Sequence, residues 1–175
     1  MITAKDVEAV LTYHPETGVF IWKERSSNEM PDQRHRKSWN SKFAGREAGR
    51  ISGTGYIQLL IKGKFYYAHR VAWLLMTGSW PEKYIDHINR SKTDNRLINL
   101  REATRSENLR NTKMHSDNRS GIKGVSWFPR DRLWRARLNK DGKVVYLKYF
   151  KRLADAEKAI ILERNSLHGE FSCSA

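Results

Sequence analysis

The stretch YIDHINRSKTDNRLINLREATRSENLRN, residues 84–111, decides the fold because it alternates short apolar runs with polar, turn-forming segments. The run around Ile85 is typical of a short strand that enters a polar loop, and a second apolar run follows at 97–100. Thr104 and Glu107 then have the spacing of a capping box, which predicts that a helix begins there. The stretch therefore predicts two short strands joined by a loop and followed by a helix.

Four polar residues of this stretch form a set suited to phosphodiester hydrolysis: Asp86, His87, Asn99 and Asn108. A histidine titrates near neutrality and can take a proton from water. A hard divalent cation such as Mg²⁺ prefers oxygen ligands, and Asp86 and the amide of Asn108 offer such oxygens. Neighbouring residues of a regular strand point to opposite faces, so Asp86 and His87 can share a site only where the strand ends. We therefore predict one metal between the strand pair and the helix.

The same stretch resembles the His-Asn-His (HNH) homing endonucleases of phages and mobile introns. Residues, order and spacing agree together, and with the upstream segments they extend the resemblance over about residues 10–112. The matching elements are Asp86-His87, Asp94-Asn95-Arg96, Asn99-Leu100-Arg101 and Ser106-Glu107-Asn108, preceded by His69-Arg70-Val71-Ala72-Trp73 and Gly78-Ser79-Trp80-Pro81. In the upstream part, the resemblance suggests phosphate contact by His69 and Arg70.

The resemblance also implies a role for each residue of the set. Asp86 is then a metal ligand, and His87 is the general base. Asn99 holds the loop and orients His87 without touching the metal. Asn108 is the second metal ligand, at a position where relatives often carry His. Because an amide is a neutral and weak ligand, one loosely held Mg²⁺, or Mn²⁺, is expected rather than Zn²⁺. The substrate implied is double-stranded DNA, cut to 5′-phosphate and 3′-hydroxyl ends.

A second small module is predicted at 120–175. Three strand-like runs at 124–128, 134–139 and 144–150 precede an amphipathic helix that begins near Leu153. In the middle run, period-two alternation places two arginines on one face and apolar side chains on the other. The arginines are Arg135 and Arg137, and the apolar residues are Trp134, Ala136 and Leu138.

This module resembles the ethylene-response-factor (Apetala-two-like) DNA-binding domains of plants, in which a three-stranded sheet packs on one helix. The matching segments are Gly124-Val125-Ser126-Trp127, Trp134-Arg135-Ala136-Arg137 and Leu167-His168-Gly169-Glu170-Phe171. The resemblance implies DNA contact by Arg135 and Arg137, with Trp127 and Trp134 as further candidates that can instead pack in the core. Two departures are Lys148, where relatives usually have Gly, and Lys151-Arg152, which replace the residues that normally cap the helix.

We therefore expect an α+β chain: a strand-strand-helix (His-Me finger) nuclease module at 1–112, a linker at 113–119, and a three-stranded antiparallel sheet packed on one helix at 120–175. In the first module, further elements are predicted. They are a helix within 1–13, a strand at 19–22, a long polar loop at 26–55, a hairpin at 56–67 and a helix at 69–76.

Charge and composition favour the same class of function. Thirty-three Lys and Arg face nineteen Asp and Glu, a net charge of +14, which favours a polyanionic partner. The single cysteine, Cys173, excludes an internal disulfide or a cysteine-based zinc site. No apolar stretch reaches the ~20 residues that cross a bilayer, so no membrane partner and a cytoplasmic location are expected.

Alternatives to the nuclease also fit part of the sequence. One is a regulator that binds DNA on the same scaffold without cutting it, and the intact set of Asp86, His87, Asn99 and Asn108 argues against this. Another is a nuclease or binding protein directed at RNA, which the resemblance of the second module to duplex-DNA binders disfavours. The target site, strand selectivity and oligomeric state, monomer or homodimer, stay open.

Overall fold

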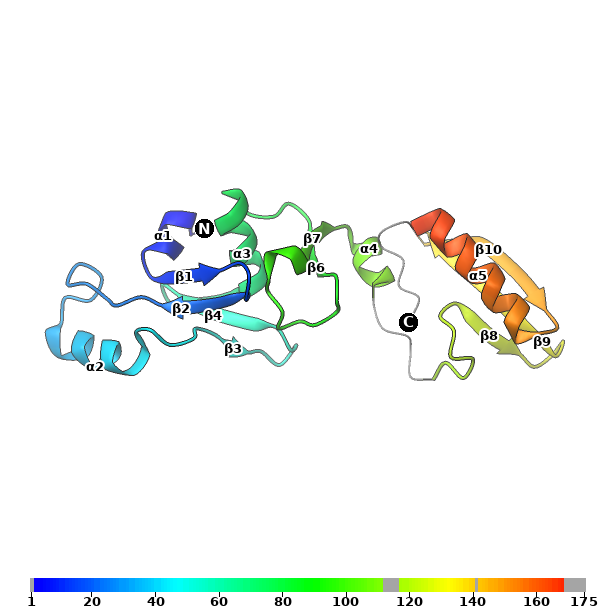
Figure 1. Cartoon of the computed structure of the whole chain (residues 1–175), viewed down its shortest axis with the longest axis horizontal. Helices are drawn as coiled ribbons and strands as arrows, with labels where there is room; N and C mark the ends of the chain where they lie inside the picture. The colour runs from blue at the N-terminus through cyan, green and yellow to red at the C-terminus, as the bar shows by residue number, and fades with distance from the viewer. Residues whose placement is uncertain (1, 112–116, 141, 169–175) are drawn as a thin grey trace. The chain divides into compact units, whose positions relative to one another are not determined.

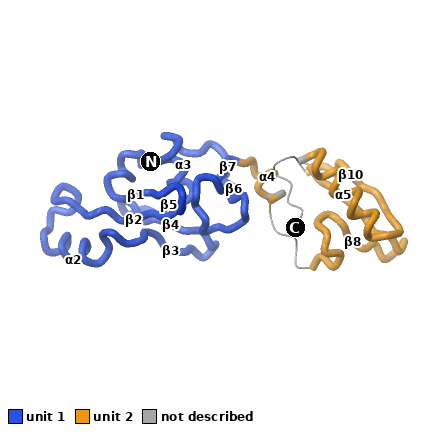
Figure 2. Tube along the Cα trace, viewed as in Figure 1, with its two compact units in different colours: residues 1–102 blue, residues 103–175 orange. Residues whose placement is uncertain are grey.

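The computed structural model describes residues 2–111, 117–140 and 142–168, and it divides the chain into two compact units (Figures 1 and 2). Unit 1 is Met1–Glu102 and unit 2 is Ala103–Ala175. The fold is mixed α and β with several small sheets, as predicted. Most of the predicted linker at 113–119 lies outside the described residues. No helix in the described ranges is long and apolar enough to span a membrane.

Unit 1 contains three small sheets, β1-β2, β3-β4-β5 and β6-β7, around one apolar core. Its elements are α1 (Ala4–Glu8), β1 (Leu11–His14), β2 (Val19–Trp22), α2 (Gln33–Phe43), β3 (Arg50–Ile51), β4 (Ile57–Ile61), β5 (Lys64–Tyr67), α3 (Ala68–Thr77), β6 (Tyr84–His87), the 3₁₀ turn η1 (Leu97–Asn99) and β7 (Leu100–Ala103). The fully buried side chains of the core include Val7, Leu11, Leu59, Ile61 and Val71. The core therefore draws on α1, β1, β4 and α3.

The N-terminal helix ends earlier than the predicted range 1–13 allows, because residues 11–13 belong to a strand. Thr3 caps α1 in a capping box with Asp6, and the helix ends within two turns. From Leu11 onward the chain pairs antiparallel with β2, so that Tyr13 lies opposite Phe20. The alternating bulk of Leu11 and Tyr13 suits a half-buried strand, and this cross-strand pairing prevails over helical spacing.

The turn between β1 and β2 packs tightly against a segment far along the chain. Gly18 adopts φ +75°, and a Cβ at this position would lie 2.5 Å from the backbone nitrogen of Arg96. The hydroxyl of Tyr13 donates to the carbonyl oxygen of Asn95 at 2.7 Å. The amide of Leu97 donates to the carbonyl oxygen of Pro15 at 3.2 Å. The N-terminal hairpin therefore supports the chain at residues 95–97.

The prediction of a loop at 26–55 was wrong for the middle of this range, where the helix α2 forms. The Asp32 side chain caps its first turn, and its partly buried aromatic residues are Trp39 and Phe43. Trp39 meets Trp22 edge to face, with ring centroids 5.6 Å apart. With so few apolar residues, α2 lacks the periodicity on which a helix prediction depends.

The β4-β5 hairpin and α3 agree with the prediction. Lys62 and Gly63 both have positive φ, 48° and 74°, as a two-residue turn of a tight hairpin requires. Helix α3 follows β5 directly and ends at Gly78, whose φ of 77° is left-handed. Its buried face includes Val71, Ala72 and Leu74, and the helix packs against β4 and β5.

Unit 2 contains a three-stranded antiparallel sheet in the order β10-β9-β8, with a helix packed on it. Its elements are α4 (Arg105–Arg110), β8 (Val125–Phe128), β9 (Leu133–Lys140), β10 (Lys143–Phe150) and α5 (Leu153–His168). The core of the sheet and α5 consists of Val125, Ala136, Leu138, Ala156 and Ile160. The side chains of β9 alternate as the sequence predicts, with Ala136 and Leu138 buried and Arg137 exposed.

Gly124 provides a test of this packing. Its φ is +81°, and a Cβ would lie 2.9 Å from the carbonyl oxygen of Arg137 and 3.3 Å from Ile160. The control is Gly121, which has φ +70° and open space around a Cβ. We expect Gly121→Ala to cost about 1–2 kcal/mol from backbone strain alone. Gly124→Ala should cost about 1–3 kcal/mol more from overpacking, measured by urea unfolding. Equal losses would contradict the close approach.

Candidate functional site

Strand β6 carries the predicted acid–base pair into the interior of unit 1. Asp86 is 3% exposed and His87 is 4% exposed. The strand ends at His87, and the next residue, Ile88, donates its amide to the carbonyl oxygen of Asn99 at 2.9 Å. Strand β7 lies beside β6 in the same two-stranded sheet. The end of β6 therefore places both side chains where the chain turns into the polar loop.

Asn99 closes this loop with its side chain. Its Oδ1 accepts a hydrogen bond from the amide of Asn89 at 2.9 Å, and its Nδ2 donates to the carbonyl oxygen of Asp94 at 2.8 Å. The side chain of Asp94 accepts from Asn89 Nδ2 at 2.6 Å and from Arg96. The hydrogen bonds from Arg96 are the main reason that the pKa of Asp94 falls to about 2. A charged Asp94 and the amide of Asn99 thus hold both ends of the loop.

Two histidines and two tyrosines form one cluster at the end of β6, here named the His–Tyr cluster: Tyr56, Tyr67, His69 and His87. The rings of His69 and His87 lie 5.1 Å apart, edge to face. Tyr56 lies 5.1 Å from His69 and 5.7 Å from His87, and Tyr67 stacks on His69 at 5.5 Å. Tyr56 and His69 therefore pack against His87, and Tyr67 packs against both of them.

Burial keeps both rings of the cluster neutral at pH 7. It is the main cause that lowers the pKa of His69 to about 3; repulsion from His87 in its protonated form and from Arg70 adds to it. Burial also lowers the pKa of His87, although Asn95 and Asp86 favour its protonated form. A neutral imidazole has a nitrogen that can accept a proton. His87 therefore has the protonation state that a general base needs.

Lys92 and Tyr56 are residues of this site that the sequence did not single out. The ammonium of Lys92 lies 4.9 Å from the centre of the Tyr56 ring and donates to the carbonyl oxygen of Thr54 at 2.9 Å. Burial raises the pKa of Tyr56, and the negative charge of Asp86 adds to this effect. No motif or spacing links Tyr56 to β6, because the two meet only through the folded sheet.

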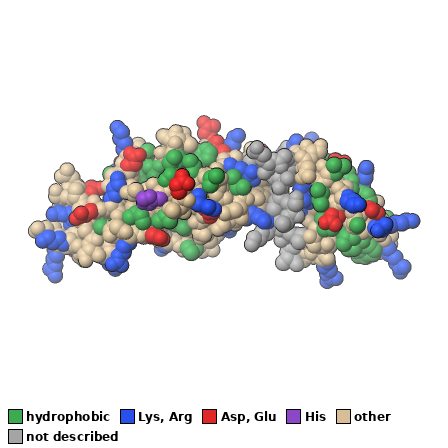
Figure 3. Space-filling model, in the orientation of Figure 1, with side chains coloured by type: hydrophobic (Ala, Val, Ile, Leu, Met, Phe, Trp, Pro, Cys, Tyr) green, Lys and Arg blue, Asp and Glu red, His purple; other side chains and the backbone are tan. Residues whose placement is uncertain are grey.

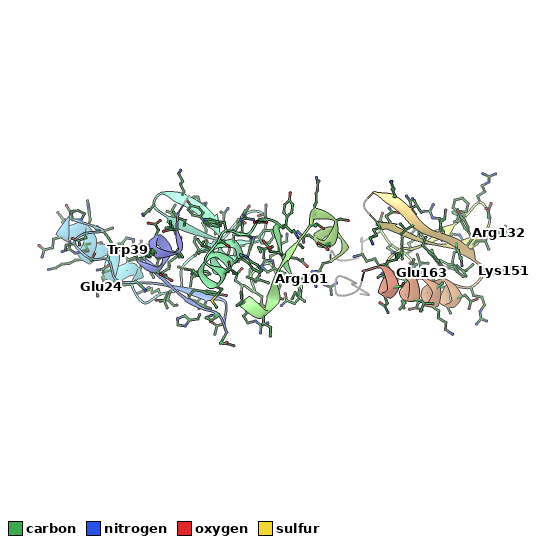
Figure 4. All side chains as sticks on the ribbon, turned by 90° about the horizontal axis from the view of Figure 1, so that it is seen from above. Glu24, Trp39, Arg101, Arg132, Lys151 and Glu163 are labelled. Atoms are coloured by element: carbon green, nitrogen blue, oxygen red, sulfur yellow. The ribbon has the colours of Figure 1, made fainter. Side chains whose placement is uncertain are left out.

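Arg101 holds the carboxylate of Asp86 from the neighbouring strand. Both Nε and Nη2 of Arg101 bond to Oδ2 of Asp86, at 3.0 and 2.9 Å, and Figure 4 labels this arginine. Charge-assisted bonds of this kind fix a carboxylate in direction as well as in charge. The Asn99-Leu100-Arg101 motif contains the residue, but the sequence did not indicate this role.

Asn108, the other predicted metal ligand, lies in α4 and is partly buried. The predicted capping box is confirmed at the start of this helix. The amide of Thr104 donates to Glu107 Oε2 at 2.7 Å, and the amide of Glu107 donates to Thr104 Oγ1 at 3.2 Å. Because Asp86 belongs to unit 1 and α4 to unit 2, the joint ligation of one metal by Asp86 and Asn108 stays a prediction.

The donor chemistry fits a weakly held, hard cation. Among the described residues no group of three His, Cys, Asp or Glu side chains could hold a metal ion. Mg²⁺ commonly takes only one or two carboxylates and completes its shell with water and substrate phosphate. The buried carboxylate of Asp86 is a donor of that type, and the predicted amide oxygen of Asn108 would be another.

Arg70, predicted to contact phosphate, holds the chain between α3 and β6. Its Nη1 donates to the carbonyl oxygen of Lys83 at 3.3 Å, and its Nη2 donates to that of Pro81 at 3.2 Å. The guanidinium carbon also lies 6.0 Å from the Trp80 ring. These bonds give Arg70 a structural role, and a phosphate contact by Arg70 or His69 stays a prediction.

In unit 2, the predicted DNA-contacting residues lie on two faces of the sheet. Trp127 pairs with Trp134 across β8 and β9, with ring centroids 5.0 Å apart, and Trp127 is 45% exposed. By strand alternation, both tryptophans share the face of Val125, which α5 covers. Arg135 and Arg137 lie on the opposite face. Their Nε atoms donate to Ser126 Oγ at 3.3 Å and to Asn139 Oδ1 at 3.1 Å.

Comparison with known proteins identifies a family for this part of the chain. The HNH endonuclease family matches residues 66–110, which run from β5 to α4 and contain Asp86, His87, Asn99 and Asn108. The chain is also 34% identical over 113 residues to "Protein 3.8" of Escherichia phage T7, which covers 62% of this chain and 93% of the phage protein. The chain belongs to the family of this phage protein and carries an HNH endonuclease domain. No solved structure matches it.

The lowered pKa values of the two buried histidines predict a dependence of stability on pH. Below about pH 6.5 the unfolded chain binds protons that the folded cluster resists, so the free energy of unfolding should fall as the pH decreases. Each histidine contributes up to about 1.4 kcal/mol per pH unit. We expect His69→Phe to reduce the slope between pH 4.5 and 6.5, measured by urea unfolding. Tyr67→Phe keeps both histidines and should keep the wild-type slope. A wild-type slope in His69→Phe would contradict the assignment.

Proposed function

We propose that the chain is a divalent-metal-dependent endonuclease that hydrolyses phosphodiester bonds in double-stranded DNA. The observation that carries the proposal is His87, buried and neutral beside Asp86 at the end of β6, within the segment that matches the HNH endonuclease family. HNH nucleases generally depend on a divalent metal. The net charge of +14 suits a DNA substrate.

In the proposed mechanism His87 acts as the general base. Its neutral ring takes a proton from the water that attacks phosphorus, and a pKa below the ordinary value keeps the ring ready for this at pH 7. Asn99 acts as a positioning residue, because it closes the loop that begins directly after His87. The rings of Tyr56 and His69 exclude bulk water from the buried side of the imidazole.

Asp86 and Asn108 would hold the metal ion, Mg²⁺ or Mn²⁺. When bound, such an ion stabilises the negative charge that develops on the phosphate and on the departing 3′ oxygen. Arg101 holds the Asp86 carboxylate in a fixed direction through two hydrogen bonds to its Oδ2. The expected products carry a 5′-phosphate and a 3′-hydroxyl.

The sheet of unit 2 is proposed as the element that makes cleavage site-selective, as in homing endonucleases. Arg135 and Arg137 lie on the central strand, on the face opposite α5, where the groove of a duplex could reach them. A β-ribbon fits the major groove, and arginine recognises guanine edges there. Trp127 and Trp134 would contribute at the exposed end of their shared face.

The general base is tested with His87→Ala on supercoiled plasmid and phage DNA, with Mg²⁺ or with chelator. We expect metal-dependent cleavage by the wild type and a loss of about 10²–10⁴-fold in the variant, because proton removal from water is lost. His14→Ala, at the exposed end of β1, is the matched control and should cut normally. Cleavage by His87→Ala at the wild-type rate would contradict the proposal.

DNA binding by the wild type without cutting, over several divalent metals and many sequences, would favour the regulator.

The second metal ligand is tested with Asn108→Ala. Loss of an oxygen donor should raise the Mg²⁺ concentration needed for half-maximal cleavage, while the rate at saturating Mg²⁺ falls less. Ser106→Ala changes a neighbouring residue of α4 and should leave the metal requirement unchanged. A normal Mg²⁺ requirement in Asn108→Ala would remove this residue from the proposed ligand set.

A further inference from the structure

We propose that the exposed basic face of α2 binds the phosphate backbone of duplex DNA and provides unit 1 with a second contact away from the cleaved bond. This inference rests on the proposed function, since it concerns the same substrate. Neither the family match at 66–110 nor the residues assigned to the site include α2.

The α2 segment is strongly basic between two flanking acidic residues, Asp32 and Glu47. Residues 33–46 contain five Lys or Arg and no Asp or Glu. One of them, Arg36, turns inward and donates to the carbonyl oxygen of Met30 at 2.8 Å. The other four, Arg34, Lys37, Lys42 and Arg46, are exposed. Within the described ranges no Asp or Glu forms an ion pair with any of these four.

The opposite face of α2 anchors the helix to the residues that follow β2. The guanidinium carbon of Arg25 lies 4.6 Å from the Trp39 ring, and the backbone amide of Arg25 donates to Asn40 Oδ1 at 2.9 Å. Asn40 Nδ2 in turn donates to Glu24 at 3.3 Å, and Figure 4 labels Glu24 and Trp39 at this junction. The basic face is therefore presented by a helix whose other side is fixed.

Spacing places two of the exposed cations and one hydroxyl on one side of α2. Arg34, Lys37 and Ser41 are separated by three and four residues, so they are neighbours on one side of the helix. Like charges at such spacing repel one another, and a polyanion that lies along this side relieves the repulsion. Two lysine or arginine side chains and a hydroxyl are typical donors to consecutive phosphates.

The position of α2 within unit 1 separates this contact from the cleavage chemistry. Figure 1 shows α2 at one end of unit 1 and β6 and β7 at the other, and Figure 4 shows Trp39 of α2 far from Arg101 of β7. Blue side chains project from the end that carries α2 in Figure 3. A duplex held at β6 would meet α2 at a different part of its backbone, so the contact lengthens the bound site without reading bases.

The test measures binding of the full chain to a labelled duplex in chelator, where no cleavage occurs, at several salt concentrations. Arg34→Ala/Lys37→Ala keeps good helix formers in α2 and removes two charges. Each lost phosphate contact lowers the slope of log K against log salt by about 0.9, so we expect a decrease of about 1.8. The affinity ratio of wild type to variant should then fall about twelvefold between 50 and 200 mM salt.

Two matched variants make the outcome specific. Lys5→Ala/Lys64→Ala removes the same charge from exposed positions on α1 and β5 and should keep the wild-type slope. Arg34→Lys/Lys37→Arg keeps both charges and should bind as the wild type does. An unchanged slope in the alanine pair on α2, or an equal loss in the α1 and β5 pair, would overturn the proposal. Binding is measured without cleavage. A chain that never cuts DNA would therefore contradict the proposed nuclease activity, but it would not change the outcome of this binding test.

Discussion

The rest of the site depends on the two hydrogen bonds that the side-chain amide of Asn99 makes across one loop. Its Oδ1 accepts a hydrogen bond from the backbone amide of Asn89, and its Nδ2 donates to the backbone carbonyl of Asp94. The amide thus joins the two ends of the loop. An aspartate could accept from Asn89 but could not donate to the carbonyl of Asp94, and a leucine could do neither. Because this loop begins directly after His87, its closure determines where the end of β6 points.

Burial of His87 has a cost that the surrounding rings offset. An imidazole inside the protein loses water, and this loss lowers its pKa and removes the charged form. Rings of Tyr56 and His69 pack against it and provide contact in place of solvent. The burial that costs free energy therefore also selects the neutral form of the imidazole, which is the form that can accept a proton. The cost of burying His87 and its capacity to accept a proton therefore have the same physical origin.

Sequence reasoning predicted the elements whose signals are local. The hairpin at 56–67, the helix at 69–76 and the capping box of α4 each depend on neighbouring residues. It failed for α2, whose stability comes from contacts of Trp39 and Asn40 with residues 22–25. It also missed Arg101 and Tyr56 as partners of Asp86 and His87, because these contacts exist only once strands and loops distant in sequence meet.

The support that the N-terminal hairpin gives to residues 95–97 connects parts of the chain that are 82 residues apart at Tyr13 and Asn95. Trp80 likewise donates to the carbonyl oxygen of Ile2, 78 residues away. Contacts of such separation form late, because a long loop must close first. During synthesis, the β1-β2 hairpin can therefore contact residues 95–97 only after most of unit 1 has emerged. A nascent chain therefore lacks these supporting contacts until residues 80–97 have emerged.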